Sequence, residues 1–508
     1  MFDTLATQNP RFANPRASGV LVHPTSFPSP YGMGDLGKAA YTFVDFMKIA
    51  NQKLWQVLPL GPTGFGDSPY QSFSTFAGNH YLISPDELRS QGWLSESDIK
   101  NIPWFDPRAI DYGQVINYKM GLFKKAYATY KATATATQKK LVTDFCTKNA
   151  DWLEDYALFS ALKDHFGGAE WHRWPAPLAH RESAAIAEMR KTLSDAVDFC
   201  KFLQYEFFRQ WGELKAYANK AGLSIIGDIP IFVAGDSADV WASPELYLLD
   251  KNGRPTAVAG VPPDYFSETG QLWGNPLYNW DEHKKTNYQW WCKRVAATLS
   301  TVDIVRIDHF RGFESYWAVP ATEKTAVNGK WLKGPAEAVF DAIKKSLGDL
   351  PIIAEDLGEI TKEVDDLRKN LNLPGMRVLH FAFDPSGKSN HMPHNYEDSR
   401  TVVYSGTHDN NTTQGWYHEA TEGERDYLRR ALSVSGNDVA WDLIRYALST
   451  NALFAIVPIQ DIMNLGASDR MNCPGLAQGW WKFRYTEEML SQNQAASMAY
   501  LTDMYNRN

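Results

Sequence analysis

Residues 304–313 read IVRIDHFRGF, and the stretches PIIAEDLGEI at 351–360 and TVVYSGTHDNN at 401–411 share its plan. Each opens with apolar residues and reaches a carboxylate where loop residues take over: Asp308, Glu355 and Asp409. Such runs are typical of parallel strands that are buried on both faces and bring a reactive side chain to the mouth of a barrel. Acids placed there suit sugar chemistry, because cleavage of a glycosidic bond needs one carboxyl group to donate a proton and another to attack or stabilise the ring.

Eight short apolar runs, these three among them, occur along the chain, and eight is the number of strands that a (β/α)8 barrel requires. They are residues 19–23, 54–60, 223–232, 302–308, 350–356, 376–383, 401–406 and 454–460. Helical patterns separate several of them, for example at 36–51 and 360–371, as crossovers between parallel strands require. We therefore expect an α/β fold, a (β/α)8 TIM barrel.

The spacing of the runs is uneven and predicts large insertions on this barrel. Roughly 160 residues separate the second run from the third and roughly 70 the third from the fourth, where a plain βα unit takes ~30. We expect residues 1–508 to form a single catalytic barrel with a largely helical insertion at 61–222 and a lid or substrate-binding insertion at 233–301. Within the second insertion, residues 260–280 combine Pro, Gly, Tyr, Phe and Trp without periodicity. That composition fits a functional loop and an ordinary packed connection equally well.

Composition narrows the classes of partner. The 508 residues carry a net charge of −8, and the pI is near 5.9, which argues against nucleic acid or an anionic membrane as the main partner. The four cysteines lie far apart and show neither zinc-site spacing nor the density of a disulfide scaffold. The N-terminal residues lack the apolar core of a signal peptide, and no run approaches the ~20 apolar residues that span a bilayer. We expect reduced thiols in a cytoplasmic protein.

Arg306 and Asp308 are two positions apart on a predicted strand, so their side chains point the same way. A guanidinium beside the acid stabilises its ionised form, which suits a carboxylate that must attack as a nucleophile. An isolated pair of this kind is more often a structural ion pair. Asp228, in the GDIPIF stretch of the third run, adds a fourth acid in an equivalent position, although alone it would be read as a helix cap or turn former.

Glu355 needs the opposite environment, because a carboxyl group that is desolvated and close to other acids has a raised pKa and can hold a proton to donate. Asp356 should point to the other side and could cap the following helix. His408 and Asp409 lie past the seventh run, where they could bind adjacent hydroxyls of one sugar. They could also be part of a metal site, but no further His or Cys stands at ligand spacing, so we expect no metal.

Seven long motifs in order resemble the amylomaltase family, bacterial 4-α-glucanotransferases or disproportionating enzymes of the α-amylase superfamily. They are HPTSFPSPYGMGDLG (23–37), LPLGPTGFGDSPYQSFSTFAGN (58–79), IIGDIPIFV (225–233), GVPPDYFSETGQLWGNPLYNW (260–280), VRIDHFRGFESYWAVP (305–320), AEDLG (354–358) and THDNNT (407–412). The resemblance covers roughly residues 17 to 485 and is poorest at about 114–200 within the helical insertion, near 420–445 and in the C-terminal tail.

The resemblance implies that Asp308 is the nucleophile, Glu355 the general acid/base and Asp409 the stabiliser of ring hydroxyls. It also implies two groups of substrate-binding residues. On the donor side Arg306 and His408 flank the three acids, and Asp228 and Tyr70 contact the donor sugar. On the acceptor side the group consists of the aromatic residues Tyr265, Phe266 and Trp273, with Ser68, Gln271 and Asn275 as polar contacts.

The predicted reaction is a retaining double displacement on α-1,4-glucans such as maltooligosaccharides, amylose, starch or glycogen. A hydrolase of the α-amylase type remains the alternative, since the three acids alone do not separate transfer from hydrolysis. A non-catalytic glycan-binding protein is disfavoured by the presence of all three acids with Arg306. We expect no cofactor, because the sequence has no phosphate-binding glycine loop, dinucleotide fingerprint or EF-hand-like calcium loop.

Overall fold

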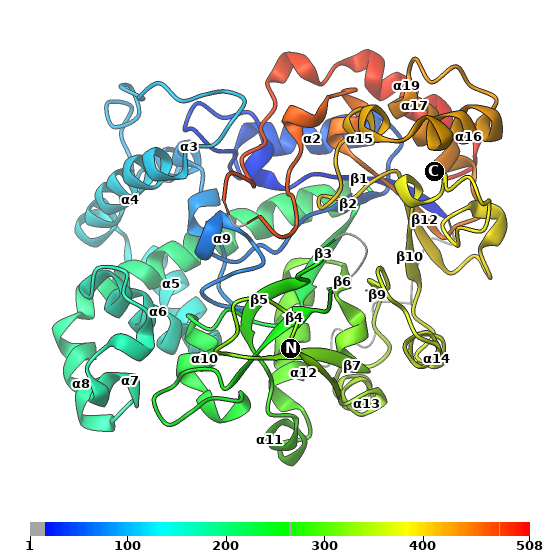
Figure 1. Ribbon diagram of the computed structural model, residues 1–508. Helices are drawn as coiled ribbons and strands as arrows, with labels where there is room; N and C mark the ends of the chain where they lie inside the picture. Colours follow the sequence, from blue (N-terminus) through cyan, green and yellow to red (C-terminus); the bar gives the residue numbers. More distant parts are fainter. Residues whose placement is uncertain (1–15, 264–266, 477) are drawn as a thin grey trace.

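The centre of the molecule is a barrel of eight parallel strands, seen in a computed structural model that describes residues 16–263, 267–476 and 478–508 (Figure 1). In spatial order the strands are β10 (Gly375–Val378), β11 (Thr401–Tyr404), β12 (Phe454–Pro458), β1 (Ala17–Leu21), β2 (Leu54–Gln56), β3 (Ser224–Pro230), β6 (Ile304–Asp308) and β9 (Ile352–Ala354). The backbone N–H of Ala354 donates to the carbonyl of Pro374, 2.9 Å away, and so links the two end strands. This confirms the predicted TIM barrel with insertions.

Each of the eight predicted runs overlaps a barrel strand, and every strand except β6 ends before its run does. Run 54–60, for example, holds only the three residues of β2 before the chain turns into a loop. The strands are buried almost throughout, as the continuous apolar runs predicted. The carboxyl ends of the parallel strands therefore meet at one rim, and the loops that follow them bear the polar residues of the site.

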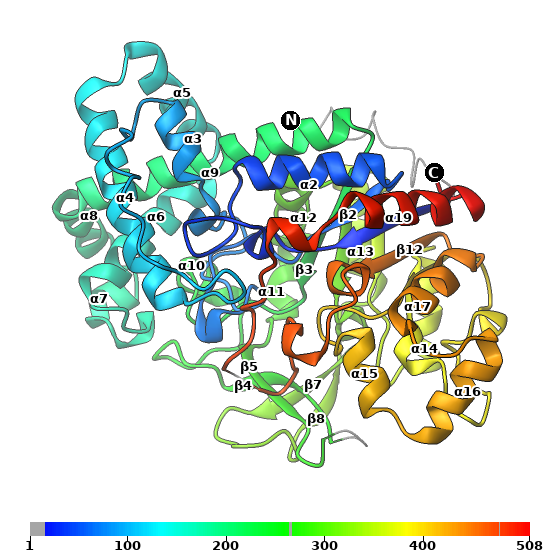
Figure 2. The same ribbon diagram turned by 90° about the horizontal axis from the view of Figure 1, so that it is seen from above.

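Helices cover the barrel on all sides, and the largest group follows β2. The group comprises α3 (Pro85–Ser90), α4 (Tyr112–Thr133), α5 (Ala136–Lys148), α6 (Ala150–His165), α7 (Ala176–Ala179), α8 (Ser183–Thr192) and α9 (Ser194–Lys220). It forms a flank opposite the helices α14 (Lys362–Asn370), α15 (Thr413–Glu419), α16 (Glu422–Leu432) and α17 (Val439–Ser449), as both views show (Figures 1 and 2). The other helices are α2 (Lys38–Ile49), α10 (Ala238–Ala242), α11 (Trp280–Lys285), α12 (Gln289–Thr301), α13 (Glu337–Leu347), α18 (Ile459–Ile462) and α19 (Gln492–Met504).

A second, four-stranded sheet was not anticipated from the sequence. Its order is β5 (Gln271–Pro276), β4 (Ala257–Val261), β7 (Ser315–Pro320) and β8 (Lys330–Lys333), and all its pairs are antiparallel. Strands β4 and β5 come from the loop after β3, whereas β7 and β8 come from the loop after β6. Two neighbouring βα loops are thus joined in one small sheet, and β5 carries predicted substrate-binding residues. None of the helices among the described residues has the length and apolar character needed to cross a membrane.

Candidate active site

Arg306 holds two carboxylates at the ends of neighbouring strands. Strands β3 and β6 pair so that Asp228 lies opposite Arg306. The Nη1 atom of Arg306 lies 2.6 Å from Oδ2 of Asp228 and 2.9 Å from Oδ1 of Asp308, and the Arg306 side chain is only 3% exposed. Although burial opposes the charge, these two carboxylates raise the pKa of the Arg306 guanidinium well above its usual value. The arginine is therefore a permanent cation beside Asp308, as the two-residue spacing predicted.

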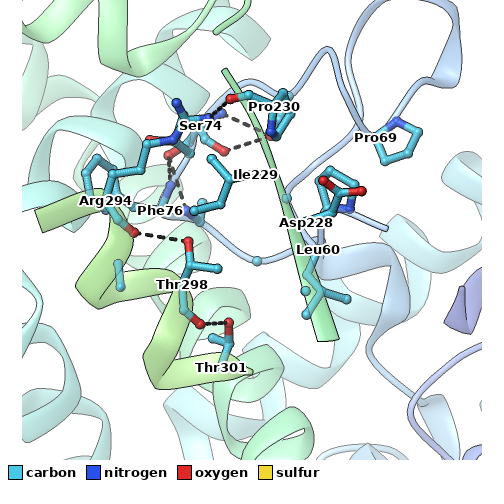
Figure 3. A pocket seen from close by; sticks show the side chains of 18 of the residues that line it. Leu60, Pro69, Ser74, Phe76, Asp228, Ile229, Pro230, Arg294, Thr298 and Thr301 are labelled. Carbon is cyan, nitrogen blue, oxygen red and sulfur yellow. Dashed lines mark hydrogen bonds between the residues drawn. The ribbon is translucent and has the colours of Figure 1, made fainter. Parts of the chain in front are cut away.

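The Asp228 side chain lies on the side of β3 that faces Tyr70 and Arg306. In Figure 3, which shows a small cavity of about 80 Å³ along β3, Asp228 and Ile229 lie on opposite sides of the strand. The Oδ2 atom of Asp228 accepts hydrogen bonds from Tyr70 Oη, at 2.9 Å, and from Arg306. Burial raises the pKa of Asp228 to about 7, with Arg306 acting in the opposite direction. Asp228 thus orients both Tyr70 and Arg306.

Glu355 follows the last residue of β9, directly beside Asp308. Ile307 and Ala354 are paired across β6 and β9, so the next residues along the two strands are Asp308 and Glu355. The backbone N–H of His309 donates to Oε2 of Glu355 at 2.6 Å, and that of Leu357 donates to Oε1 at 2.7 Å. Burial first, and the nearby charge of Asp308 second, raise the pKa of Glu355 to about 8. At neutral pH this carboxyl group holds its proton.

The backbone at His309 makes this contact possible. His309 has φ of 52°, in the left-handed region that residues other than glycine seldom adopt. The turn directs its N–H toward Glu355 immediately after the strand that bears Asp308. Asp356, in contrast, points away: it accepts from Met376 N–H at 2.6 Å and lies within 3.3 Å of two arginines, Arg368 and Arg377. Only one of the two consecutive acids therefore faces Asp308, as predicted.

Asp409 lies on a loop five positions beyond β11 and is held by side chains from another loop. Asn472 Nδ2 donates to Oδ1 of Asp409 at 2.6 Å, and Arg470 Nη2 donates to the Asp409 carbonyl at 2.7 Å. The Nε2 atom of His408 lies 3.4 Å from Oδ2 of Asp409. The Asp409 side chain is 40% exposed, so it remains open to a ligand.

Tyr70 connects the two parts of the site. Its ring stacks on that of His408, with centroids 5.2 Å apart and planes inclined by 9°, while its hydroxyl donates to Asp228. Asp228 in turn contacts Arg306. One side chain thus joins the strand-borne acids to the loop that bears Asp409.

A buried carboxylate closes the base of the Asp409 loop. Asp461 Oδ2 accepts from Ser405 Oγ at 2.6 Å and from Thr413 Oγ1 at 2.7 Å, and its Oδ1 accepts from the Thr413 N–H at 3.0 Å. Ser405 precedes the loop and Thr413 follows it. Asp461 therefore ties both ends of the segment that presents His408 and Asp409.

Asp308, Asp409 and Tyr70 line a cleft of about 480 Å³, whereas Glu355, Arg306 and Asp228 are buried and do not form part of its wall. Its walls include Asp308, Asp409, Tyr70, Ser68, Gln271, Trp273, Asn275, Phe65, Leu272, Asn472, Cys473, Leu476 and Trp481. The predicted acceptor residues Ser68, Gln271, Trp273 and Asn275 are thus brought to the same cleft as Asp308 and Asp409. Tyr265 and Phe266, predicted beside them, lie outside the described residues.

Trp273 contacts His309, the residue whose backbone N–H donates to Glu355. Its ring meets that of His309 edge to face, with centroids 4.8 Å apart and an angle of 83°. Its indole N–H donates to the side-chain oxygen of Gln271 at 3.1 Å. The small four-stranded sheet therefore packs against His309, the residue that directly follows Asp308.

Sequence reasoning missed the segment 470–481, which supplies Arg470, Asn472 and Trp481 to the site, and it missed Asp461. The segment has a usable signal, because NCPG at 472–475 and the Trp-Trp pair that follows lack periodicity, like residues 260–280. Asp461 has no such signal, since a single acid after an apolar run also caps helices. Its role depends on contacts with residues some 50 positions away.

The arrangement can break an acetal bond. One carboxylate, Asp308, is 27% exposed to the cleft beside a permanent cation, and a neighbouring carboxyl group, Glu355, is protonated at neutral pH. A carboxylate that attacks and an acid that donates are the two groups that a retaining glycosidic mechanism requires.

Comparisons with known proteins agree with this chemistry. Residues 22–490 match the model of a family described as 4-alpha-glucanotransferase. The 4-alpha-glucanotransferases of Synechocystis sp. and Thermus thermophilus are 49% and 48% identical, over 97% of this chain and 98% and 99% of their own lengths. The solved structure of amylomaltase from Streptococcus agalactiae in complex with acarbose has a TM-score of 0.94 at 41% identity, and the match covers 97% of this chain and 100% of that chain.

Proposed function

Because the chain belongs to the 4-α-glucanotransferase family and is an enzyme of that activity, we propose that Asp308, Glu355 and Asp409 carry out the transfer. The family acts on α-1,4-glucans. The enzyme moves a glucan segment from a donor to the 4-hydroxyl of an acceptor glucan or glucose, with retention at carbon 1. Its substrates are maltooligosaccharides and longer chains such as amylose, starch or glycogen.

In the first step Glu355 gives its proton to the glycosidic oxygen as the bond from that oxygen to carbon 1 breaks. A carboxylate oxygen of Asp308 attacks carbon 1 from the opposite face and forms an ester. The raised pKa of Glu355, about 8, supports its role as the acid. The Arg306 cation, 2.9 Å from Asp308, supports the role of an ionised nucleophile.

In the second step the acceptor 4-hydroxyl attacks carbon 1, gives its proton to the Glu355 carboxylate and displaces Asp308. Asp409 and His408 bind ring hydroxyls of the donor sugar throughout, and Asp228 and Tyr70 complete that subsite. Ser68, Gln271, Trp273 and Asn275 form the acceptor side. Two displacements at the same carbon restore the original configuration.

The observation that carries the proposal is the pairing of β6 with β9, which sets an Arg-bound carboxylate beside a buried carboxyl group whose pKa is raised. It is tested by trapping the ester with a fluorinated α-maltosyl fluoride, which forms the intermediate but resolves it slowly. Mass spectrometry of peptides is expected to find the sugar on Asp308. A label on another residue, or none under conditions of turnover, would contradict the assignment.

Analysis of the products formed from pure maltotriose distinguishes transfer from hydrolysis. Transfer yields glucose and longer chains while the number of reducing ends stays constant, whereas an α-amylase-like hydrolase raises that number. We expect constant reducing ends. The full-length match to 4-alpha-glucanotransferases supports this outcome over the hydrolytic alternative.

We place the enzyme in the cytoplasm. All four cysteines are free, and unpaired thiols are the rule in reducing compartments. Fractionation of cells that produce the protein, followed by immunodetection, tests the location. Recovery outside the cytoplasmic fraction would contradict it.

A further inference from the structure

A small cavity of about 20 Å³ lies behind His408, on the side of the site formed by β1, β12 and the loop after β11. Its walls are Leu21, Val22, His23, Ser26, Leu58, His408, Pro458, Ile459, Gln460, Met471 and Phe483. His23 and Ser26 belong to the motif HPTSFPSPYGMGDLG, for which the proposed mechanism assigns no role. A cavity of this size holds about one water molecule.

Three of the side chains that line the cavity carry polar atoms without a hydrogen-bond partner among the described residues. They are His23 Nδ1, Ser26 Oγ and the ring nitrogens of His408, all of them buried. The three residues are 3%, 1% and 6% exposed. Buried polar atoms are rarely left unpaired in folded proteins, and an ordered water with two to four such partners is the common solution.

Both imidazoles are neutral at neutral pH. Burial, and then the nearby His408, lower the pKa of His23 to about 3. Burial likewise lowers the pKa of His408, with Asp409 opposing the effect. A neutral imidazole has one donor and one acceptor nitrogen, and the partner of one nitrogen decides which is which.

We propose that His23 and Ser26 are positioning residues that hold His408 in one tautomer through a single buried water in this cavity. The water donates to Nδ1 of His408 and to Nδ1 of His23, and it accepts from the Ser26 hydroxyl. Nε2 of His408 then carries the proton, on the side where it lies 3.4 Å from Oδ2 of Asp409. His408 thereby points its Nε2 proton toward the Asp409 side of the site, where a ring hydroxyl of the donor sugar can accept it.

The stacking of Tyr70 on His408 fixes the plane of the ring but not the position of its proton. The water supplies this missing constraint. Without it, the two tautomers of His408 interconvert, and in one of them an unprotonated Nε2 faces a carboxylate oxygen. The inference rests on the proposed function, because it assigns His408 to the donor-sugar subsite.

The direct test is the tautomer of His408 in the full-length enzyme labelled with [¹⁵N]histidine. Two-bond ¹H–¹⁵N spectra distinguish protonated from unprotonated ring nitrogens, and the His408 signals are assigned by their loss in His408→Gln. We expect a neutral ring with the proton on Nε2 and a hydrogen-bonded, unprotonated Nδ1. A proton on Nδ1 in the unmodified enzyme would overturn the proposal, as would a high-resolution crystal structure without a water in the cavity.

Two substitutions at His23 distinguish a role in positioning His408 from a role in packing alone. His23→Leu removes the polar atom, whereas His23→Asn keeps one near the place of Nδ1. We expect His23→Leu to mix the His408 tautomers and to lower kcat about tenfold, the effect of one lost hydrogen bond, with KM changed less than about twofold. His23→Asn should restore a single tautomer and return kcat to within about threefold of the unmodified enzyme. Equal effects of the two variants would show a packing role and contradict the proposal.

Ser26→Ala and Met471→Leu complete the set. Ser26→Ala removes the donor to the water and should lower kcat by roughly threefold. Met471→Leu alters an apolar wall of the same cavity and should leave the tautomer unchanged. If His23→Leu fails to fold, the unmodified spectrum and Ser26→Ala still decide the matter. The tautomer is read without turnover, so loss of sugar labelling on Asp308 would refute the proposed function and leave this result standing.

Discussion

The two halves of the site are held in place by different means. Asp228, Arg306 and Asp308 are fixed by the pairing of buried strands, and Glu355 is fixed by backbone N–H groups at the end of the next strand. Asp409 lies on a loop. Its position depends on side chains that reach it from another loop, above all Asn472, 2.6 Å from its carboxylate.

The two kinds of support predict different responses to substitution. A strand end cannot shift without disturbing the barrel, so changes in the strand-borne half should remove chemistry while leaving geometry intact. The loop of Asp409 has alternatives to its observed shape, because loops open more readily than core strands. Changes in its supports should reduce activity by degrees, since the carboxylate is misplaced but still present.

The largest effect is expected from the strand-borne nucleophile. Asp308→Asn keeps the shape and loses the attacking charge, so transfer from maltotriose should fall by at least ~10⁴-fold, as for other covalent nucleophiles. The melting temperature should change little, because Asp308 lies at the rim of the barrel. The measurement is initial-rate product analysis together with thermal unfolding. Asp349→Asn, at an exposed position, serves as the control and should keep full activity.

Residual activity of Asp308→Asn near the unmodified level would contradict this distinction between the two halves of the site. It would mean that the strand-borne half does not carry the covalent step, whatever its rigidity. The same result with a strongly lowered melting temperature would instead indicate that Asp308 serves the fold.

The proton on Glu355 predicts the alkaline limit of activity. The raised pKa, about 8, means that the acid form predominates at neutral pH and is lost as the pH rises through 8. A carboxylate cannot donate a proton, so kcat/KM should fall on the alkaline side with a midpoint near pH 8. Burial and then the Asp308 charge raise the pKa of Glu355, so Asp308→Asn should move the Glu355 titration to lower pH. The titration is measured by ¹³C NMR of labelled glutamate.

An alkaline limit that lies several units away from 8, or a Glu355 titration unmoved by Asp308→Asn, would contradict the assignment. Asp303→Asn is the matched control, because Asp303 lies on the same stretch of chain at the other end of β6. It should leave the Glu355 titration where it is.

The loop-borne half should show an intermediate effect. Asn472→Ala removes the donor to Oδ1 of Asp409, and we expect kcat to fall about tenfold, the worth of one hydrogen bond to a charged group. Asp409→Ala, which removes the carboxylate itself, should be far more severe. The comparison is made by steady-state kinetics on maltotriose, with Asn370→Ala at an exposed helix end as a control that should be silent.

If Asn472→Ala were as damaging as Asp409→Ala, the loop would have a single support and the two halves would not differ in kind. Wild-type activity in Asn472→Ala would show that Arg470 and Asp461 hold the loop without it.

The strand-borne half was within reach of the sequence because strand geometry is periodic. Arg306 and Asp308 stand two apart, which places both on one side of the strand, and the same rule turned Asp356 away from Glu355. The barrel itself followed from eight apolar runs. The contacts that hold the Asp409 loop could not be predicted, because Asn472 and Asp461 come from segments that are distant in the sequence and reach the loop only in the folded chain. The second sheet was missed for a similar reason: its strands come from two different βα loops and are short and only partly apolar.

The smallest effect is expected at Trp273, where the small sheet meets the strand-borne half. Water is far more abundant than any glucan, so transfer prevails only while the covalent intermediate is shielded and the acceptor is well bound. Trp273→Ala opens the cleft beside His309, and we expect the hydrolysed share of product to rise roughly threefold while total turnover stays within about twofold. Trp273→Phe keeps an aromatic ring against His309 and should preserve the ratio, measured as reducing ends formed per glucose released. An unchanged ratio in Trp273→Ala would mean that the sheet does not shield the intermediate, and that discrimination against water resides in acceptor binding alone.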